Sequence, residues 1–379
     1  MQGAEHVGKV RSANGNLPHI LSRFTAHQNS MAAVMHTGIG IGKHHRGNPA
    51  ASLRIQHVYG TPVLLSGVGS LVLSKEEFKM IDNHLNKTLQ NMMRLHVRTP
   101  HCVTAFLAGC LPGTALVHLR ILSNFGMITR SPDSILYKLG LEIFSQYKPS
   151  CKSWFSQVRD ICLLYQLPHP IVLMKKPMTK LTLKKLVKKS VVEYWEAKLR
   201  LEASQLSSLK YFCASNLSLY TPHPLWLSAS ASAYEVSKAT VQARMLSGRY
   251  RTELLCSHWS DNPNGWCLTP QCLGTQVVED LEHILVSCPS LDHARTNLRL
   301  FTHKFATINP VVQPILSVYC HPDHPLFCQF LLDCSCLPDI HTQTETYGVT
   351  FQSMLFYIGR TWCYNLHRER ARLLGRWKY

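Results

Sequence analysis

The residues with the clearest chemical potential are three cysteines and one histidine within a short stretch of chain. They follow the pattern C-x4-C-x10-H-x4-C and comprise Cys267, Cys272, His283 and Cys288. Thiolate sulfur and imidazole nitrogen in tetrahedral geometry select zinc among the common metal ions. Four protein ligands leave no coordination position for water or substrate. The pattern therefore predicts a structural Zn²⁺ site and not a catalytic one.

Sequence alone leaves alternatives to this ligand set open. The cysteines could be small buried apolar side chains, with His283 an ordinary helix residue. Cys256 and His258 also lie near enough in the chain to replace one of the ligands. A second group has irregular spacing and intervening prolines, which favour ordinary thiols over metal ligands. This second group comprises Cys320, His321, His324, Cys328, Cys334 and Cys336.

A lysine-rich segment between Thr179 and Gln205 is a candidate for binding phosphate groups. At helical spacing its apolar residues share one face, namely Leu183, Leu186, Val187, Val191, Tyr194, Ala197 and Leu201. The other face carries Lys184, Lys185, Lys188 and Lys189. Positive charges one helical turn apart can follow a nucleic-acid backbone. The alternative is that these lysines only keep a helix face in contact with water.

A second basic group, Arg244, Arg249 and Arg251, lies shortly before the cysteine segment. From their positive charge we predict that these residues contact nucleic-acid phosphates. The alternative is that they pair with Glu235 or Glu253 within the protein.

The composition also favours a polyanionic partner. The 379 residues include 40 Lys and Arg against 22 Asp and Glu, which gives a formal net charge of +18. Such an excess favours RNA or DNA as the partner. Carboxylates are scarce, and the sequence contains neither paired aspartates for a two-metal site nor a GxxxxGK[ST] phosphate loop. We therefore expect a nucleic-acid-binding protein and not an enzyme.

Membrane and secretion signals are missing from the sequence. No segment approaches the ~18 apolar residues of a membrane-spanning helix, so we expect no membrane partner. The residues from Met1 to Val10 lack the apolar stretch of a signal peptide. We expect an intracellular protein, in the nucleus or cytoplasm and not secreted, with reduced cysteines.

The elements that must position these residues are predicted to be mainly α-helical. Ser74 and Glu77 form a capping box that begins a helix ending before Pro100. A short helix from Glu279 would carry His283. Alternation favours one strand, over 55–65, and the glycines of 37–48 indicate a loop. Helical spacing predicts further helices over 17–35, 103–127 with a break at 112–113, 154–167, 179–205, 235–251 and 352–376.

Several longer motifs resemble one known family. The runs TPHPLWLSASASAYEVSKATVQARMLSGRYRTELLCSHWS, GWCLTPQC and LEHILVSCPSL resemble the C-terminal region of the endonuclease/reverse transcriptase polyprotein of non-LTR (LINE-type) retrotransposons. The segments SWFSQVRDICLLYQLPHP, VVEYWEAKLRLEASQLSSLKYF and RARLLGRW are similar to the same polyproteins. Residues from Gly15 to Leu73 resemble the start of the polymerase thumb. The resemblance covers nearly the whole chain.

The resemblance implies a thumb and zinc-knuckle region with four parts. These are a thumb-like helical region over 1–130, a basic helical connector over 131–255, a zinc-knuckle-like segment over 256–300 and a helical tail over 301–379. In the family the thumb holds the template–primer duplex, and the knuckle region engages element RNA or target DNA. The polymerase palm and the endonuclease would lie before Met1, so the resemblance implies a non-catalytic fragment. The alternatives are a protein-interaction module, or a non-functional relic whose basic charge is incidental.

Overall fold

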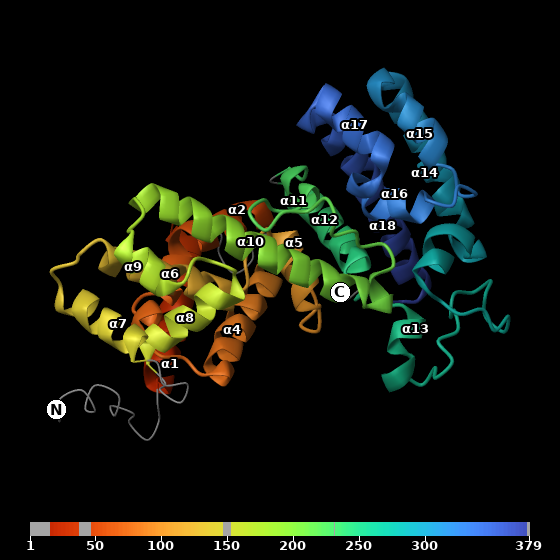
Figure 1. Ribbon diagram of the computed structural model, residues 1–379. Coiled ribbons are helices and arrows are strands. Elements are labelled where there is room, and N and C mark those ends of the chain that lie inside the picture. Colours follow the sequence, from red (N-terminus) through yellow and green to blue (C-terminus); the bar gives the residue numbers. More distant parts are fainter. Residues whose placement is uncertain (1–15, 38–46, 147–152, 231, 377–379) are drawn as a thin grey trace. The chain divides into compact units, whose positions relative to one another are not determined.

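The computed structural model describes residues 16–37, 47–146, 153–230 and 232–376, and these are mainly helical, as predicted (Figure 1). They contain no strand, and one isolated antiparallel bridge joins Trp266 to Val278. The chain divides into two compact units. The first comprises the described residues of Met1–Gly42, Leu53–Leu89 and Cys110–Leu199, and the second those of Lys43–Ser52, Gln90–Gly109 and Arg200–Tyr379. The four-part division made from the sequence stays a prediction.

The first unit contains every helix that the spacing predicted there. Its helices are α1 (Leu17–Thr37), α3 (Thr61–Leu64), α4 (Lys75–Met93), α6 (Gly113–Thr129), α7 (Ile135–Ser145), α8 (Trp154–Leu164), α9 (Pro170–Lys175) and α10 (Lys180–Ser204), of which α4 and α10 extend into the second unit. The capping box is confirmed, because the Ser74 amide donates to Glu77 Oε2 at 2.7 Å and the Glu77 amide donates to Ser74 Oγ at 3.2 Å. Most of the predicted loop over 37–48 lies outside the described residues.

The strand predicted over 55–65 is wrong, since this segment is helical. Here α2 (Pro49–Ile55) continues through a π-helical turn, Gln56–Gly60, into α3. Pro62 lies in the first turn of α3, where its missing N–H is tolerated. A Cβ on Gly60 would lie 2.6 Å from Met31 Sδ, so the turn approaches α1 closely. Packing against α1 therefore outweighed the alternation of apolar residues.

Helix α10 confirms the predicted basic helix but buries a different face. Its buried residues recur every fourth position, at Leu183, Val187, Val191, Trp195, Leu199 and Ala203. Four residues turn an α-helix by about 40° more than one full turn, so this stripe rotates around the helix. Ala197 and Leu201, which we placed on the apolar face, are therefore exposed.

The second unit is organised around α18 (Val349–Leu373), which contacts α11, α12, α14, α16 and α17 (Figure 1). Trp362 is completely buried, and its Nε1 donates to Thr302 Oγ1 at 2.9 Å. A Cβ on Gly359 would lie 2.4 Å from the Leu331 carbonyl oxygen, so glycine permits the close approach of α16. The other helices of this unit are α5 (His101–Ala108), α11 (Pro224–Leu227), α12 (Ala233–Leu246), α13 (Glu253–Cys256), α14 (Asp292–Ile308), α15 (Gln313–Tyr319), α16 (Phe327–Leu332) and α17 (Pro338–Tyr347).

Among the described helices, none by itself has both the length and the apolar composition needed to cross a bilayer. Helices α5 and α6 meet that test only when they are taken together as a bent pair.

Helix α12 ends at Leu246, five residues before the predicted end at Arg251. Gly248 adopts the left-handed conformation with φ of 64°, and the Arg249 amide donates back to the Arg244 carbonyl at 3.3 Å. This is the Schellman arrangement that commonly ends helices at glycine. A Cβ on Gly248 would lie 2.2 Å from the Ser208 carbonyl oxygen. The glycine therefore sets both the helix end and the direction of the arginine-rich turn that follows.

We expect Gly248→Ala to lower the free energy of unfolding more than Gly375→Ala does. Both glycines have similar positive φ values, 64° and 63°, but only Gly248 has atoms within 4 Å of an added Cβ. The left-handed conformation costs about 1–2 kcal/mol at either site. The overlap with Ser208 should add about 1–3 kcal/mol. Urea unfolding of both variants measures the difference, and equal losses would contradict the close approach at Gly248.

Candidate metal centre

The four predicted zinc ligands converge in the structure. One ligand atom from each of Cys267, Cys272, His283 and Cys288 lies within 4.8 Å of all the others. Cys272 Sγ lies 3.5 Å from His283 Nε2 and 3.9 Å from Cys288 Sγ. Tetrahedral zinc with Zn–S bonds near 2.3 Å requires about 3.8 Å between sulfurs, so these contacts fit a metal site. All four side chains are buried, and the group could hold a metal ion such as zinc.

A tight turn and an isolated bridge position the first two thiols. Gly265 has φ of 64°, and an added Cβ there would lie 2.6 Å from Leu254 Cα. The chain then pairs with the segment before Glu279, because the Cys267 amide donates to the Val277 carbonyl at 2.8 Å. The Cys272 amide donates to the Thr269 carbonyl at 2.9 Å, which turns the second thiol back toward the first.

A single helical turn positions the other two ligands. Asp280 caps it by accepting the His283 amide at 2.7 Å, and the π-helical turn His283–Ser287 follows. The Cys288 amide donates to the His283 carbonyl at 2.7 Å, and the Cys288 backbone is extended. The helical turn therefore ends just before Pro289, as the ligand geometry requires. This places His283 and Cys288 on the same side of the turn.

The imidazole of His283 is oriented as in many metal sites. Its Nδ1 lies 3.3 Å from Ser287 Oγ, whereas its Nε2 faces the Cys272 sulfur. Metal-ligating histidines commonly use one ring nitrogen for the metal and the other for a hydrogen bond that holds the ring. The Ser287 contact thus leaves Nε2 as the ligand atom.

The thiols have unequal proton affinities. The interaction with Cys288, together with burial, raises the pKa of Cys267 to about 12. The same interaction lowers the pKa of Cys288, and burial raises that of Cys272. Of these three thiols, Cys288 is therefore the one that ionises most readily. Metal binding must displace the remaining thiol protons, so affinity for a metal will rise with pH.

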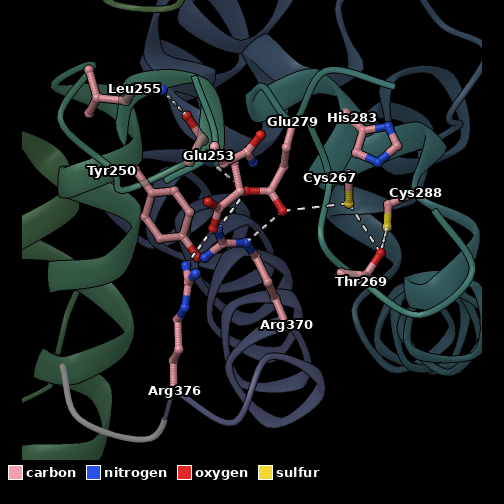
Figure 2. Close-up of polar contacts among 12 residues, drawn as sticks. Tyr250, Glu253, Leu255, Cys267, Thr269, Glu279, His283, Cys288, Arg370 and Arg376 are labelled. Carbon is pink, nitrogen blue, oxygen red and sulfur yellow. Dashed lines mark hydrogen bonds and ion pairs between the residues drawn. The ribbon is translucent and has the colours of Figure 1, made fainter. Parts of the chain in front are cut away.

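Thr269 was missed by the sequence analysis. It is completely buried, and its Oγ1 lies 3.1 Å from Cys267 Sγ and 3.4 Å from Cys288 Sγ. In Figure 2, dashed lines join it to both sulfurs. A hydroxyl at this position can stabilise a thiolate by hydrogen bonding. The one sequence feature that pointed to Thr269 is its position between Cys267 and Cys272.

A buried ion-pair network adjoins the sulfurs and was also missed (Figure 2). Glu279 Oε2 lies 3.6 Å from Cys267 Sγ and accepts from Arg370 Nε at 3.1 Å. Arg370 Nη2 also lies 2.5 Å from Glu279 Oε1 and 3.4 Å from Glu253 Oε1, and Arg376 pairs with the same Glu253 oxygen. The side chains of Arg370, Glu253 and Glu279 are at most 2% exposed. Helix α18 is thereby joined to the cysteine segment.

Arg370 had a sequence signal that we did not use. It follows Gly359, Cys363 and Leu366 on the buried side of α18, where an apolar residue would be expected. An arginine at such a position needs a buried acidic partner. Arg370 finds that partner in Glu279, and Arg376 pairs with Glu253.

The other candidate ligands lie outside the group. Within the described residues, only Cys267, Cys272, His283 and Cys288 form a cluster of three or more potential ligands. Cys256 is buried and His258 is exposed, and neither belongs to the cluster. The cysteines of the second group do not converge with its histidines into another such cluster.

The predicted phosphate-binding residues lie on α10 and at or just beyond the end of α12. Lys184, Lys185, Lys188 and Lys189 are all exposed on α10, and Lys189 Nζ lies 3.8 Å from Glu193 Oε1. Arg244 and Arg249 are half-buried and Arg251 is exposed, at and beyond the end of α12. Their contact with nucleic acid stays a prediction.

We expect purified protein to contain about one zinc ion per chain, and Cys272→Ser and His283→Ala to lose it, because each removes one of four ligands. Cys256→Ser is the matched control, since it removes a buried thiol outside the cluster and should keep the metal. Elemental analysis of the four proteins measures the zinc. Retention in both ligand variants, or loss in the control, would contradict this ligand set.

We also expect Arg370→Met to lower the free energy of unfolding by about 3–5 kcal/mol, because it leaves the buried Glu279 without a cation and Glu253 with Arg376 alone. Arg372→Met on the same helix is the control. Its guanidinium pairs with Glu369 at the surface and is 56% exposed, so its removal should change stability little. Equal effects in urea unfolding would show that the buried network is not a main source of stability.

The chain matches no protein-family model, no curated protein sequence and no solved structure.

Proposed function

We propose that this protein binds nucleic acid without catalysing a reaction, and that a structural zinc ion organises its cysteine segment. The proposal takes the protein to be similar to the thumb and zinc-knuckle region of non-LTR retrotransposon reverse transcriptases. The observation that carries it is the buried convergence of the four residues Cys267, Cys272, His283 and Cys288. Their spacing and the motifs around them are those on which the family resemblance rests.

The donor set fits a structural zinc ion better than a catalytic one. Three sulfurs and one imidazole nitrogen are soft and borderline ligands, which suit zinc and not magnesium or calcium. All four donors are buried, so no exposed coordination position is offered to a substrate. The bound ion would join the turn that carries Cys267 and Cys272 to the turn that carries His283 and Cys288. Metal binding can supply much of the folding free energy of so small a segment.

The distribution of charge supports a nucleic-acid partner. Four lysines project from one stretch of α10 into solvent, and the chain has a formal net charge of +18. Some of the arginines in the C-terminal part are used internally, such as Arg370 with Glu279 and Arg360 with Glu235. Buried pairs of this kind cancel their own charge. The lysines of α10 are different, because they are exposed and spaced to meet successive phosphates.

We expect the affinity for RNA or DNA to fall steeply as salt is added. In a plot of log affinity against log salt concentration, each phosphate contact should contribute about 0.7 to 0.9 to the downward slope. Replacing Lys184, Lys185, Lys188 and Lys189 together by Gln should reduce this slope by about 0.7 for each lysine that contacts a phosphate. Fluorescence anisotropy with labelled oligonucleotides over a salt series measures it. Arg372→Gln, in an ion pair with Glu369, is the control and should keep the parent slope.

Two outcomes would contradict the proposal. Absence of binding at low salt would remove the nucleic-acid function and favour a protein-interaction module. Binding with a slope near zero would show that phosphate contacts are not its basis.

A further inference from the structure

Five arginines gather in the second unit near the loop that follows α4. We call Arg94, Arg98, Arg244, Arg249 and Arg251 the arginine cluster. Arg244 Nε donates to the Arg94 carbonyl at 2.9 Å, which joins this loop to the last turn of α12. Arg94 itself has φ of 55°, so the chain turns sharply at the end of α4. Two segments far apart in the sequence therefore bring their basic residues to one place.

The histidine in the same loop shows how close these charges are. His96 is exposed, and its pKa is lowered first by partial burial and then by the charges of four members, Arg249, Arg98, Arg251 and Arg244. Its Nδ1 accepts the Arg98 amide at 3.1 Å, so the neutral ring carries its hydrogen on Nε2. Charges separated by more than about a Debye length, ~10 Å, barely act on one another in solution. The four guanidinium groups are therefore close enough to His96 to act on it together.

The acidic residues nearest in sequence to the end of α12 are engaged elsewhere. Glu235 pairs with Lys238 Nζ and Arg360 Nε, each at 2.8 Å. Glu253 pairs with Arg370 and Arg376. Both glutamates therefore have partners outside the arginine cluster. A concentration of positive charge of this kind is expected to attract a polyanion.

An exposed tryptophan adjoins the arginine cluster. Trp259 is 55% exposed, and the Arg98 guanidinium carbon lies 5.9 Å from its ring centroid. The ring of His258, also exposed, lies 6.5 Å away. A flat apolar surface of this size in water is a platform on which a nucleobase can stack, and a neighbouring arginine can hold the adjoining phosphate. Bases within a duplex are already stacked on one another and cannot use such a platform.

We propose that the arginine cluster and Trp259 form a binding site for single-stranded nucleic acid, in which arginines hold phosphates and Trp259 stacks on a base. This inference rests on the proposed function, and it names the kind of nucleic acid and the site. Single-stranded RNA and single-stranded DNA share the chemistry that this site recognises. Stacking is nearly independent of base identity, so the site selects unpaired strands and not a sequence.

Three variants separate the stacking contact from the phosphate contact. Trp259→Ala should weaken binding of single strands by about 5- to 100-fold without changing the salt slope. Trp259→Phe should keep most of the affinity, since it retains a ring. Arg98→Gln should reduce the slope by about 0.7, because it removes one phosphate contact to a single strand. Anisotropy with labelled oligouridine, oligothymidine and a duplex measures all three, and thermal unfolding checks that each variant is folded.

The controls change similar surface residues outside the site. Tyr347→Ala removes an aromatic side chain that is 56% exposed, and Arg368→Gln removes an exposed arginine of α18. Both should bind as the parent does. A loss in Trp259→Ala for only one of the two oligonucleotides would identify RNA or DNA as the ligand and support the site.

Other outcomes would overturn the inference. If the parent binds nucleic acid, and both Trp259→Ala and Arg98→Gln bind it as tightly as the parent does, the site is elsewhere. The proposed function would then stand. If Trp259→Ala weakens duplex and single strands alike, the selectivity for single strands is wrong. If the parent binds no nucleic acid, both the proposed function and this site fall together.

Discussion

The second unit depends on the buried guanidinium of Arg370. It lies between Glu279 and Glu253, and all three side chains are nearly inaccessible to water. Two carboxylates in such a place would each lose several kcal/mol of hydration without a compensating cation. The arginine supplies that charge from α18, the helix on which most of the unit's other helices pack. Because Glu279 also touches Cys267, the order of the cysteine cluster is linked to the packing of α18.

Buried ion pairs such as that of Arg370 also show where this basic chain places some of its few acidic side chains. Glu235, Glu253 and Glu279 each hold a cation within the second unit, and Asp333 lies 3.4 Å from His223 in a fully buried contact. Acidic residues used in this way stabilise helix contacts and are not spread among the surface cations. The basic excess is then carried by exposed residues such as Lys184 and Arg98. A surface of that character supports the nucleic-acid partner that we propose, and the buried arginines contribute nothing to it.

The cysteine segment has little regular structure to stabilise it. Between α13 and α14 the chain has one isolated bridge, short turns, two short 3-10 helices and a single π-helical turn. Ile284 and Leu285 are buried, and this turn contacts α18, but the ligands themselves sit in turns that a metal ion would cross-link. Local backbone hydrogen bonds already aim the four side chains at one another. A bound ion would therefore consolidate an arrangement that the backbone favours.

The sequence by itself determined the features that depend on neighbouring residues. Helix periodicity and the Ser74–Glu77 capping box predicted most helices, and the cysteine spacing predicted a cluster whose members are held by turns of a few residues. Tertiary structure decided what depends on distant segments. Packing on α1 made 55–65 helical, and the rotation of the buried stripe exposed Leu201 on α10. Arg370 and Glu279 are 91 positions apart, and Arg244 and Arg94 are 150 apart. The reason is physical. Periodicity, caps and short loops act over a few residues, whereas a buried ion pair or a cluster of arginines needs partners that only the folded chain brings together.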